Sequence, residues 1–304
     1  MCRLMVVVVA SVVIWIGPAT LLMADVNADE ITKILNEWKP TADQKSRLSV
    51  VLLRATDTDD GGIGTVRSVL GDSGVKNAAV IFDVLRDMDV ARREKLLVGL
   101  LLSTPALDES MRNSCAYLLE ATTHKCSSDL LFDTVKTAEK PDDITIIVAI
   151  AFAETRKAEL EQLALKWSKT ILKETGGEAD QAVQQSLIRL LGLVGKQACY
   201  ETVLRYLDVA WEADAPTVLL AVEVLGKGKF VQSFSRLKEI ARKRDPADTH
   251  VRIGALRSLA EIAKPSQVDE LIGIARSIYG SGTPFPEEAK RALDEVIKRL
   301  QEAR

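Results

Sequence analysis

Apolar residues recur along most of the chain with the spacing of amphipathic helices, arranged as pairs of short segments. Val251, Ala255 and Leu259 fall on one face of a predicted helix. After a short break, Val268 and Leu271 mark one face of a second helix. The strict alternation of apolar and polar residues that indicates a β-strand is sustained nowhere in the sequence. The pattern therefore predicts an all-α protein.

These pairs of segments repeat about every 34 residues, with four additional residues in the unit that begins at residue 142. An ungapped alignment gives equivalent units beginning at Asp180, Asp214 and Asp248, 34 residues apart. The same pattern, followed towards the N-terminus, gives repeat starts near residues 41, 74, 108, 142, 180, 214 and 248. Residues 286–304 form a charged amphipathic pattern, which predicts a single helix that closes the array against water.

Repetition of this kind predicts how the helices pack. A single helix pair cannot bury both of its apolar faces, whereas a stack of pairs buries them as one continuous core. No Pro- or Ser-rich linker divides residues 29–304, so we expect one elongated domain. The predicted fold is an α-solenoid of about seven helix pairs with a C-terminal capping helix.

The most regular unit carries a recognisable motif. Between Asp248 and Leu271 the sequence follows D-x-x-V-R-x-x-A-L-x-x-L-x-x-I and then P-x-x-V-x-x-L. This motif resembles the HEAT repeat, in particular the short form named after phycobilisome lyases. The W-x2-L-G-x2-Y start of tetratricopeptide repeats does not recur here. The resemblance extends over about residues 108–275 and implies an armadillo/HEAT-like superhelix with a concave surface.

Two pairs of charged residues occupy equivalent repeat positions. Arg112 aligns with Arg252, and Asp129 aligns with Asp269. The resemblance implies that such residues brace neighbouring helices. Ligand binding by the two arginines is the alternative interpretation.

The sequence pattern of the N-terminal segment predicts a targeting signal rather than a part of the folded domain. Residues 1–28 combine an early basic residue, Arg3, with an apolar run over 4–16 and small residues before Ala28. This order is typical of a secretory signal peptide, and we expect cleavage after Ala28 and a periplasmic or secreted mature chain. A retained membrane anchor is the alternative, because residues 4–24 reach the length of ~20 residues that a membrane span requires.

Export changes how the cysteines are interpreted. Removal of the signal peptide leaves Cys115, Cys126 and Cys199, an odd number for an oxidising compartment. Cys126 and Cys199 lie two repeats apart, which exceeds the ~7 Å between Cα atoms that a disulfide tolerates. We therefore expect free thiols, with one disulfide as the alternative.

Composition and charge narrow the classes of function. The 40 basic and 43 acidic residues give a net charge of −3, which does not favour nucleic-acid binding. The two histidines, His124 and His250, lie in different units, and no zinc, triad or phosphate-loop pattern surrounds them. We expect no catalytic, metal or cofactor site, so the sequence predicts a protein that is not an enzyme.

One group of cations is a candidate contact for an anion or a partner. The group gathers at the end of a predicted second helix and consists of Arg236, Lys238, Arg242, Lys243 and Arg244. Cations at this place also complement the helix dipole, which is the structural interpretation.

The sequence thus predicts an exported repeat scaffold. We expect it to bind another protein through its concave surface, with contacts from side chains on the second helix of each unit. One alternative is a non-catalytic accessory subunit of an enzyme or a lyase-like HEAT protein, which the resemblance implies. The other is a membrane-tethered adaptor, if the N-terminal segment is retained.

Overall fold

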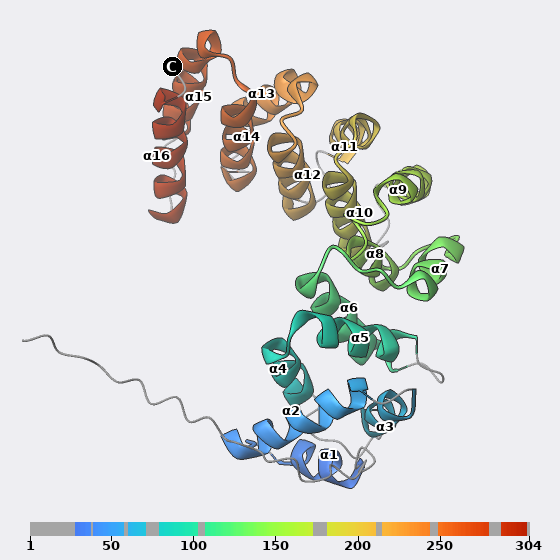
Figure 1. The fold of residues 1–304 in the computed structure, drawn as a ribbon. Coiled ribbons are helices and arrows are strands. Elements are labelled where there is room, and N and C mark those ends of the chain that lie inside the picture. Colours follow the sequence, from blue (N-terminus) through green and yellow to red (C-terminus); the bar gives the residue numbers. More distant parts are fainter. Residues whose placement is uncertain are drawn as a thin grey trace, which may run out of the picture.

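A computed structural model describes most of the chain after the predicted signal peptide. The described residues are 28–37, 39–57, 60–70, 79–102, 107–172, 181–210, 215–243, 249–279 and 287–302. Within these ranges the chain forms helices and no strand, which confirms the all-α prediction (Figure 1). Of the predicted signal peptide, residues 1–28, and its alternative as a membrane anchor, all but Ala28 lie outside the described residues.

The helices follow one another closely along the chain. The first eight are α1 (Ala28–Leu35), α2 (Ala42–Asp57), α3 (Asp60–Leu70), α4 (Ala79–Asp87), α5 (Val90–Leu101), α6 (Glu109–Thr122), α7 (Asp129–Thr137) and α8 (Asp143–Ile150). The second eight are α9 (Lys157–Ile171), α10 (Gln181–Val194), α11 (Gln197–Ala210), α12 (Ala215–Lys227), α13 (Phe234–Arg242), α14 (Thr249–Ile262), α15 (Val268–Tyr279) and α16 (Glu287–Glu302). Short 3₁₀ segments, η1 (Val231–Ser233) and η3 (Pro265–Gln267), lead into α13 and α15.

The even-numbered helices form one continuous layer. Each packs against the next, from α2 on α4 through to α14 on α16, and α7, α9, α11, α13 and α15 each pack on the even-numbered helix that follows or precedes them. The row of helices follows a curve, with α8, α10, α12 and α14 on its inner side and α7, α9, α11 and α13 on its outer side (Figure 1). We call the even-numbered row the inner layer.

This arrangement reverses one sequence-based expectation. The second helices of the units, α7, α9, α11 and α13, lie on the outer side, so the prediction that they supply the concave surface is wrong. Two glycines allow successive first helices to lie close together. A Cβ on Gly226 of α12 would lie 2.4 Å from the Cβ of Ser258 on α14, and one on Gly192 of α10 would lie 2.8 Å from a methyl of Val224 on α12.

Two aspartates at predicted repeat starts are the N-caps of the helices that follow them. The Asp108 carboxylate accepts a hydrogen bond of 2.8 Å from the backbone N–H of Met111, and Asp142 accepts one of 2.8 Å from Thr145. Both are N-caps, which satisfy backbone donors that the first turn leaves unpaired. The three later repeat starts lie outside the described residues, each one residue before a helix: Asp180, Asp214 and Asp248.

The two ends of the array are closed by amphipathic helices. The predicted C-terminal helix is α16, within residues 286–304, and it packs on α14 and α15 through Leu293, Val296 and Leu300. At the other end, α1 packs on α2 and α3, an element that the repeat pattern did not predict. No helix of the described chain is long and apolar enough to span a bilayer.

Candidate functional site

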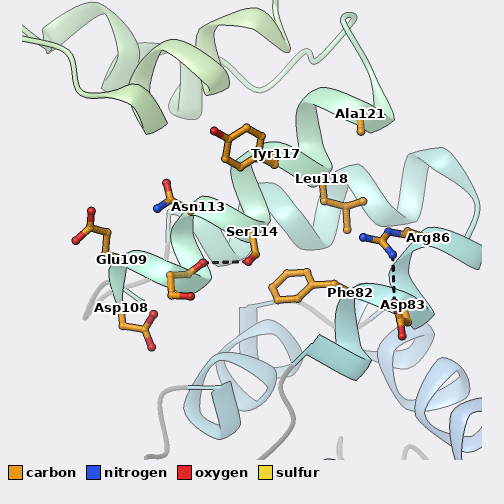
Figure 2. A pocket seen from close by; sticks show the side chains of 11 residues that line it. Phe82, Asp83, Arg86, Asp108, Glu109, Asn113, Ser114, Tyr117, Leu118 and Ala121 are labelled. Carbon is orange, nitrogen blue, oxygen red and sulfur yellow. Dashed lines mark hydrogen bonds and ion pairs between the residues drawn. The ribbon is translucent and has the colours of Figure 1, made fainter. Parts of the chain in front are cut away.

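A hollow of about 1130 Å³ lies between α4 and α6 of the inner layer (Figure 2). We call it the α4–α6 groove. Its lining consists of Phe82, Asp83, Arg86, Asp108, Glu109, Ser110, Asn113, Ser114, Tyr117, Leu118 and Ala121. Most of these residues belong to α6 and recur every three or four positions, so one face of that helix forms the long wall of the groove. At 1.5 Å per residue, this wall runs for about 16 Å from Ser110 to Ala121.

Tyr117 is the exposed aromatic residue of the groove, with 47% of its surface accessible. Its hydroxyl donates a hydrogen bond of 3.1 Å to Oδ2 of Asp143 at the start of α8. The other carboxylate oxygen of Asp143 accepts a hydrogen bond of 2.6 Å from the hydroxyl of Ser186 on α10. These bonds fix the orientation of the Tyr117 ring and join three successive helices of the inner layer.

The electrostatic surroundings keep this phenol protonated. Partial burial, followed by the negative charge of Asp143, raises the pKa of the Tyr117 hydroxyl above its ordinary value. The hydroxyl therefore remains a donor at neutral pH, and the ring keeps its place beside α8.

The groove carries an excess of negative charge. Three carboxylates, those of Asp83, Asp108 and Glu109, line it together with one cation, Arg86. The Arg86 guanidinium lies 3.2 Å from Asp83, so these two charges offset each other. Lys45 of α2 lies 3.8 Å from the other oxygen of Asp83. Among the described residues, no ion pair involves Asp108 or Glu109, at the N-terminal end of α6.

A second, smaller pocket of about 330 Å³ lies at the C-terminal ends of α6, α10 and α12. Its apolar wall includes Leu193, Leu220 and Val224. Its buried carboxylate, Glu120, forms an ion pair with Arg189. The Glu120–Arg189 pair thus offsets two charges of the wall, and Lys227 and His124 also line the pocket.

The predicted cation group bridges neighbouring outer helices. Arg236 lies 3.2 Å from Asp208 of α11 and also donates a hydrogen bond of 3.2 Å to the backbone carbonyl of Leu207. Lys238 and Arg242 both pair with Glu270 of α15. The structure thus brings three of the predicted cations together and places carboxylates of adjacent units between them.

The remaining two members of that group are Lys243 and Arg244. Lys243 is the C-cap residue of α13, where its backbone N–H donates to the last carbonyls of the helix. Arg244 lies outside the described residues. The described cations of the group therefore connect α11, α13 and α15 along the outer side.

The four residues predicted to brace neighbouring helices behave differently from one another. Arg252 is 3% exposed, and its Nε donates a hydrogen bond of 3.2 Å to the carbonyl of Ala241, which joins α14 to α13. Asp129 pairs with Arg156, the residue before α9. Arg112 is half-buried on α6, and Asp269 is exposed in the first turn of α15.

The three described cysteines are free and buried, which confirms the prediction of free thiols. Burial raises the pKa of the Cys115 thiol to about 12. Burial also raises the pKa of both Cys126 and Cys199 to about 11. These values describe unreactive core side chains, because the thiolate is the reactive form.

Two measurements test this description of the thiols. In a Cys2→Ser variant, we expect a thiol-specific reagent to leave the folded protein unmodified at pH 8 and to modify all three cysteines in urea. Since folding raises these pKa values, stability should be complete below about pH 8.5 and should fall as the pH rises towards 11. A Cys115→Ala variant should lose less stability over that range. Rapid labelling of the folded protein at pH 8 would contradict the buried placement.

The described residues that could bind a metal do not form a metal site, and the two histidines lie in different parts of the chain. Within the described residues, no group of three or more His, Cys, Asp and Glu side chains gathers closely enough to hold a metal ion. His124 lines the smaller pocket, and His250 is exposed on α14.

Comparison with known proteins gives no match: no family model matches the sequence, and no curated protein matches it. The described residues define an all-helical protein whose helices pack against their neighbours. The α4–α6 groove has a larger volume than the pocket at the ends of α6, α10 and α12.

Proposed function

We propose that this protein is an exported HEAT-like α-solenoid whose inner surface binds another protein. The 34-residue repeat and the continuous inner layer support the solenoid part of the proposal. The signal-peptide pattern of residues 1–28 supports export. The single observation that carries the binding function is the α4–α6 groove with its half-exposed, oriented Tyr117.

The size and chemistry of the groove favour a macromolecular partner over a small ligand. Pockets for small molecules usually enclose about 300–1,000 Å³ and surround the ligand. The α4–α6 groove exceeds this range and opens along a helix face. Tyrosine is among the residue types that contribute most to protein–protein affinity, especially where its ring is already held in place. Tyr117 meets this condition through its hydrogen bond to Asp143.

Site-specific cross-linking in the cells that produce the protein tests the proposal. A photoreactive residue at position 113 lies in the groove, whereas one at the exposed Leu130 of the outer helix α7 is the matched control. We expect a discrete partner to be captured from position 113 and not from position 130. Tyr117→Ala should weaken capture, since loss of a central tyrosine costs about 2 kcal/mol, or roughly thirtyfold in Kd.

A second variant separates the ring from its hydroxyl. Tyr117→Phe keeps the ring and removes only the hydrogen bond to Asp143, so we expect an intermediate loss of capture. Equal capture from positions 113 and 130, or undiminished capture by Tyr117→Ala, would refute binding through the inner surface.

A further inference from the structure

We infer that the α4–α6 groove takes a basic amphipathic helix of the partner protein. This inference rests on the proposed function and names the chemistry of the partner at the same site. Three features carry it: an apolar strip along the middle of the groove, the length and shape of the α6 wall, and unbalanced negative charge at one end.

The middle of the groove is apolar. Figure 2 shows Phe82, Leu118 and Tyr117 between acidic residues at one end and the Asp83–Arg86 pair at the other. Phe82 and Leu118 are each 8% exposed and form a floor, while Tyr117 rises from the wall with almost half of its surface accessible. A partner that covers the Tyr117 ring and the exposed edges of Phe82 and Leu118 gains most from apolar groups at these positions.

The shape of the wall favours a helix as the source of that row. Ser110, Asn113, Tyr117 and Ala121 lie along one face of α6 at spacings of three or four residues. A helix laid beside α6 presents its own apolar side chains at the same spacing, so the two sets interdigitate as they do between packed helices. The wall of about 16 Å accommodates about three helical turns.

Negative charge at the N-terminal end of α6 favours basic residues at one end of the partner helix. Asp108 and Glu109 are exposed there, and neither has a cation among the groove-lining residues beside it, because Arg86 is paired with Asp83 at the other end. The dipole of α6 contributes about half a positive charge at this point, which offsets only part of two carboxylates. Lysine or arginine at the corresponding end of the partner helix complements what remains.

Peptides of defined charge test this inference on the full chain. The probe is a fluorescently labelled amphipathic peptide of leucine and lysine, compared with the same peptide carrying glutamate in place of lysine. We expect the leucine–lysine peptide to bind, its affinity to fall at high salt, and the leucine–glutamate peptide to bind far more weakly. A leucine–lysine peptide of the same composition with a central proline cannot remain helical and should also bind weakly.

Matched variants locate the binding. Glu109→Lys reverses a charge at the first residue of α6 and should raise the Kd of the leucine–lysine peptide roughly tenfold. Glu287→Lys makes the same change at the first residue of α16 and should leave affinity unchanged. Tyr117→Ala should weaken binding by at least as much as Glu109→Lys.

Several outcomes would overturn the inference. They are equal affinity for the two charge types, equal affinity for the proline-containing peptide, or equal losses from Glu109→Lys and Glu287→Lys. If cross-linking from position 113 captures a partner while the leucine–lysine peptide does not bind, the inference fails and the proposed function stands. If the peptide binds at the groove but cross-linking captures nothing, the proposed function fails and the chemistry of the groove stands.

Discussion

Replacing Trp167 by alanine is expected to lower the free energy of unfolding by about 3–5 kcal/mol. Trp167 is 1% exposed and is among the largest fully buried side chains of the chain. It belongs to α9, and its indole N–H donates a hydrogen bond of 3.2 Å to the carbonyl of Ala138, the C-cap of α7. Alanine leaves a cavity and removes the donor, so the contact between two outer helices is lost. Urea denaturation followed by far-ultraviolet circular dichroism measures the change.

Two variants show which part of the tryptophan matters. Trp167→Phe keeps most of the packing and removes the donor, so its cost should be less than half that of alanine. Leu130→Ala removes apolar atoms from a side chain that is 65% exposed on α7, and should change stability by less than about 0.5 kcal/mol. A Trp167→Ala cost as small as that of Leu130→Ala would show that α9 does not depend on this contact.

The helices and their boundaries could be predicted because that information is local. An aspartate followed by an apolar period of three to four residues defines a helix start, and Asp108 and Asp142 are indeed N-caps. The same reasoning located α16 within residues 286–304. It missed α1, where Ile31, Ile34 and Leu35 give an apolar face over only eight residues directly after the signal-peptide pattern.

The choice of inner layer could not be predicted from periodicity, because both helices of a unit bury one face. Successive first helices of the inner layer lie close together at Gly192 and Gly226. These glycines were visible as a recurring feature of the first helices. Their meaning depends on knowing that Val224 and Ser258 of the next unit lie against them, which is a tertiary contact.

The candidate site was even harder to predict from the sequence, because its contacts join residues of different units. Tyr117 could have been noticed as an aromatic residue on the polar face of its helix, but its partner Asp143 begins the next unit. For the cation group, charges counted along one helix could not show which side chains of other units lie against them. Asp208 and Glu270, from the units before and after, lie against those cations and offset them.

Alanine in place of two glycines is expected to change stability in opposite directions. At Gly226, a Cβ would lie 2.6 Å from the backbone Cα of Ser258, so α12 and α14 must move apart. Ser258 also donates a hydrogen bond of 2.9 Å to the carbonyl of Val222, which that movement strains. Overpacking of this kind costs about 1–3 kcal/mol.

Gly273 of α15 is the matched control, because no other side chain or neighbouring helix of the described residues lies within 4 Å of the Cβ that alanine would add there. Gly273→Ala should raise the free energy of unfolding by about 0.5–1 kcal/mol through helix propensity alone. Urea denaturation of both variants measures the two changes. The same propensity gain is present at Gly226, so a net loss there measures the steric cost of separating the inner helices. Stabilisation by both substitutions would mean that the inner layer tolerates wider spacing, and the close approach assigned to the glycines would then be wrong.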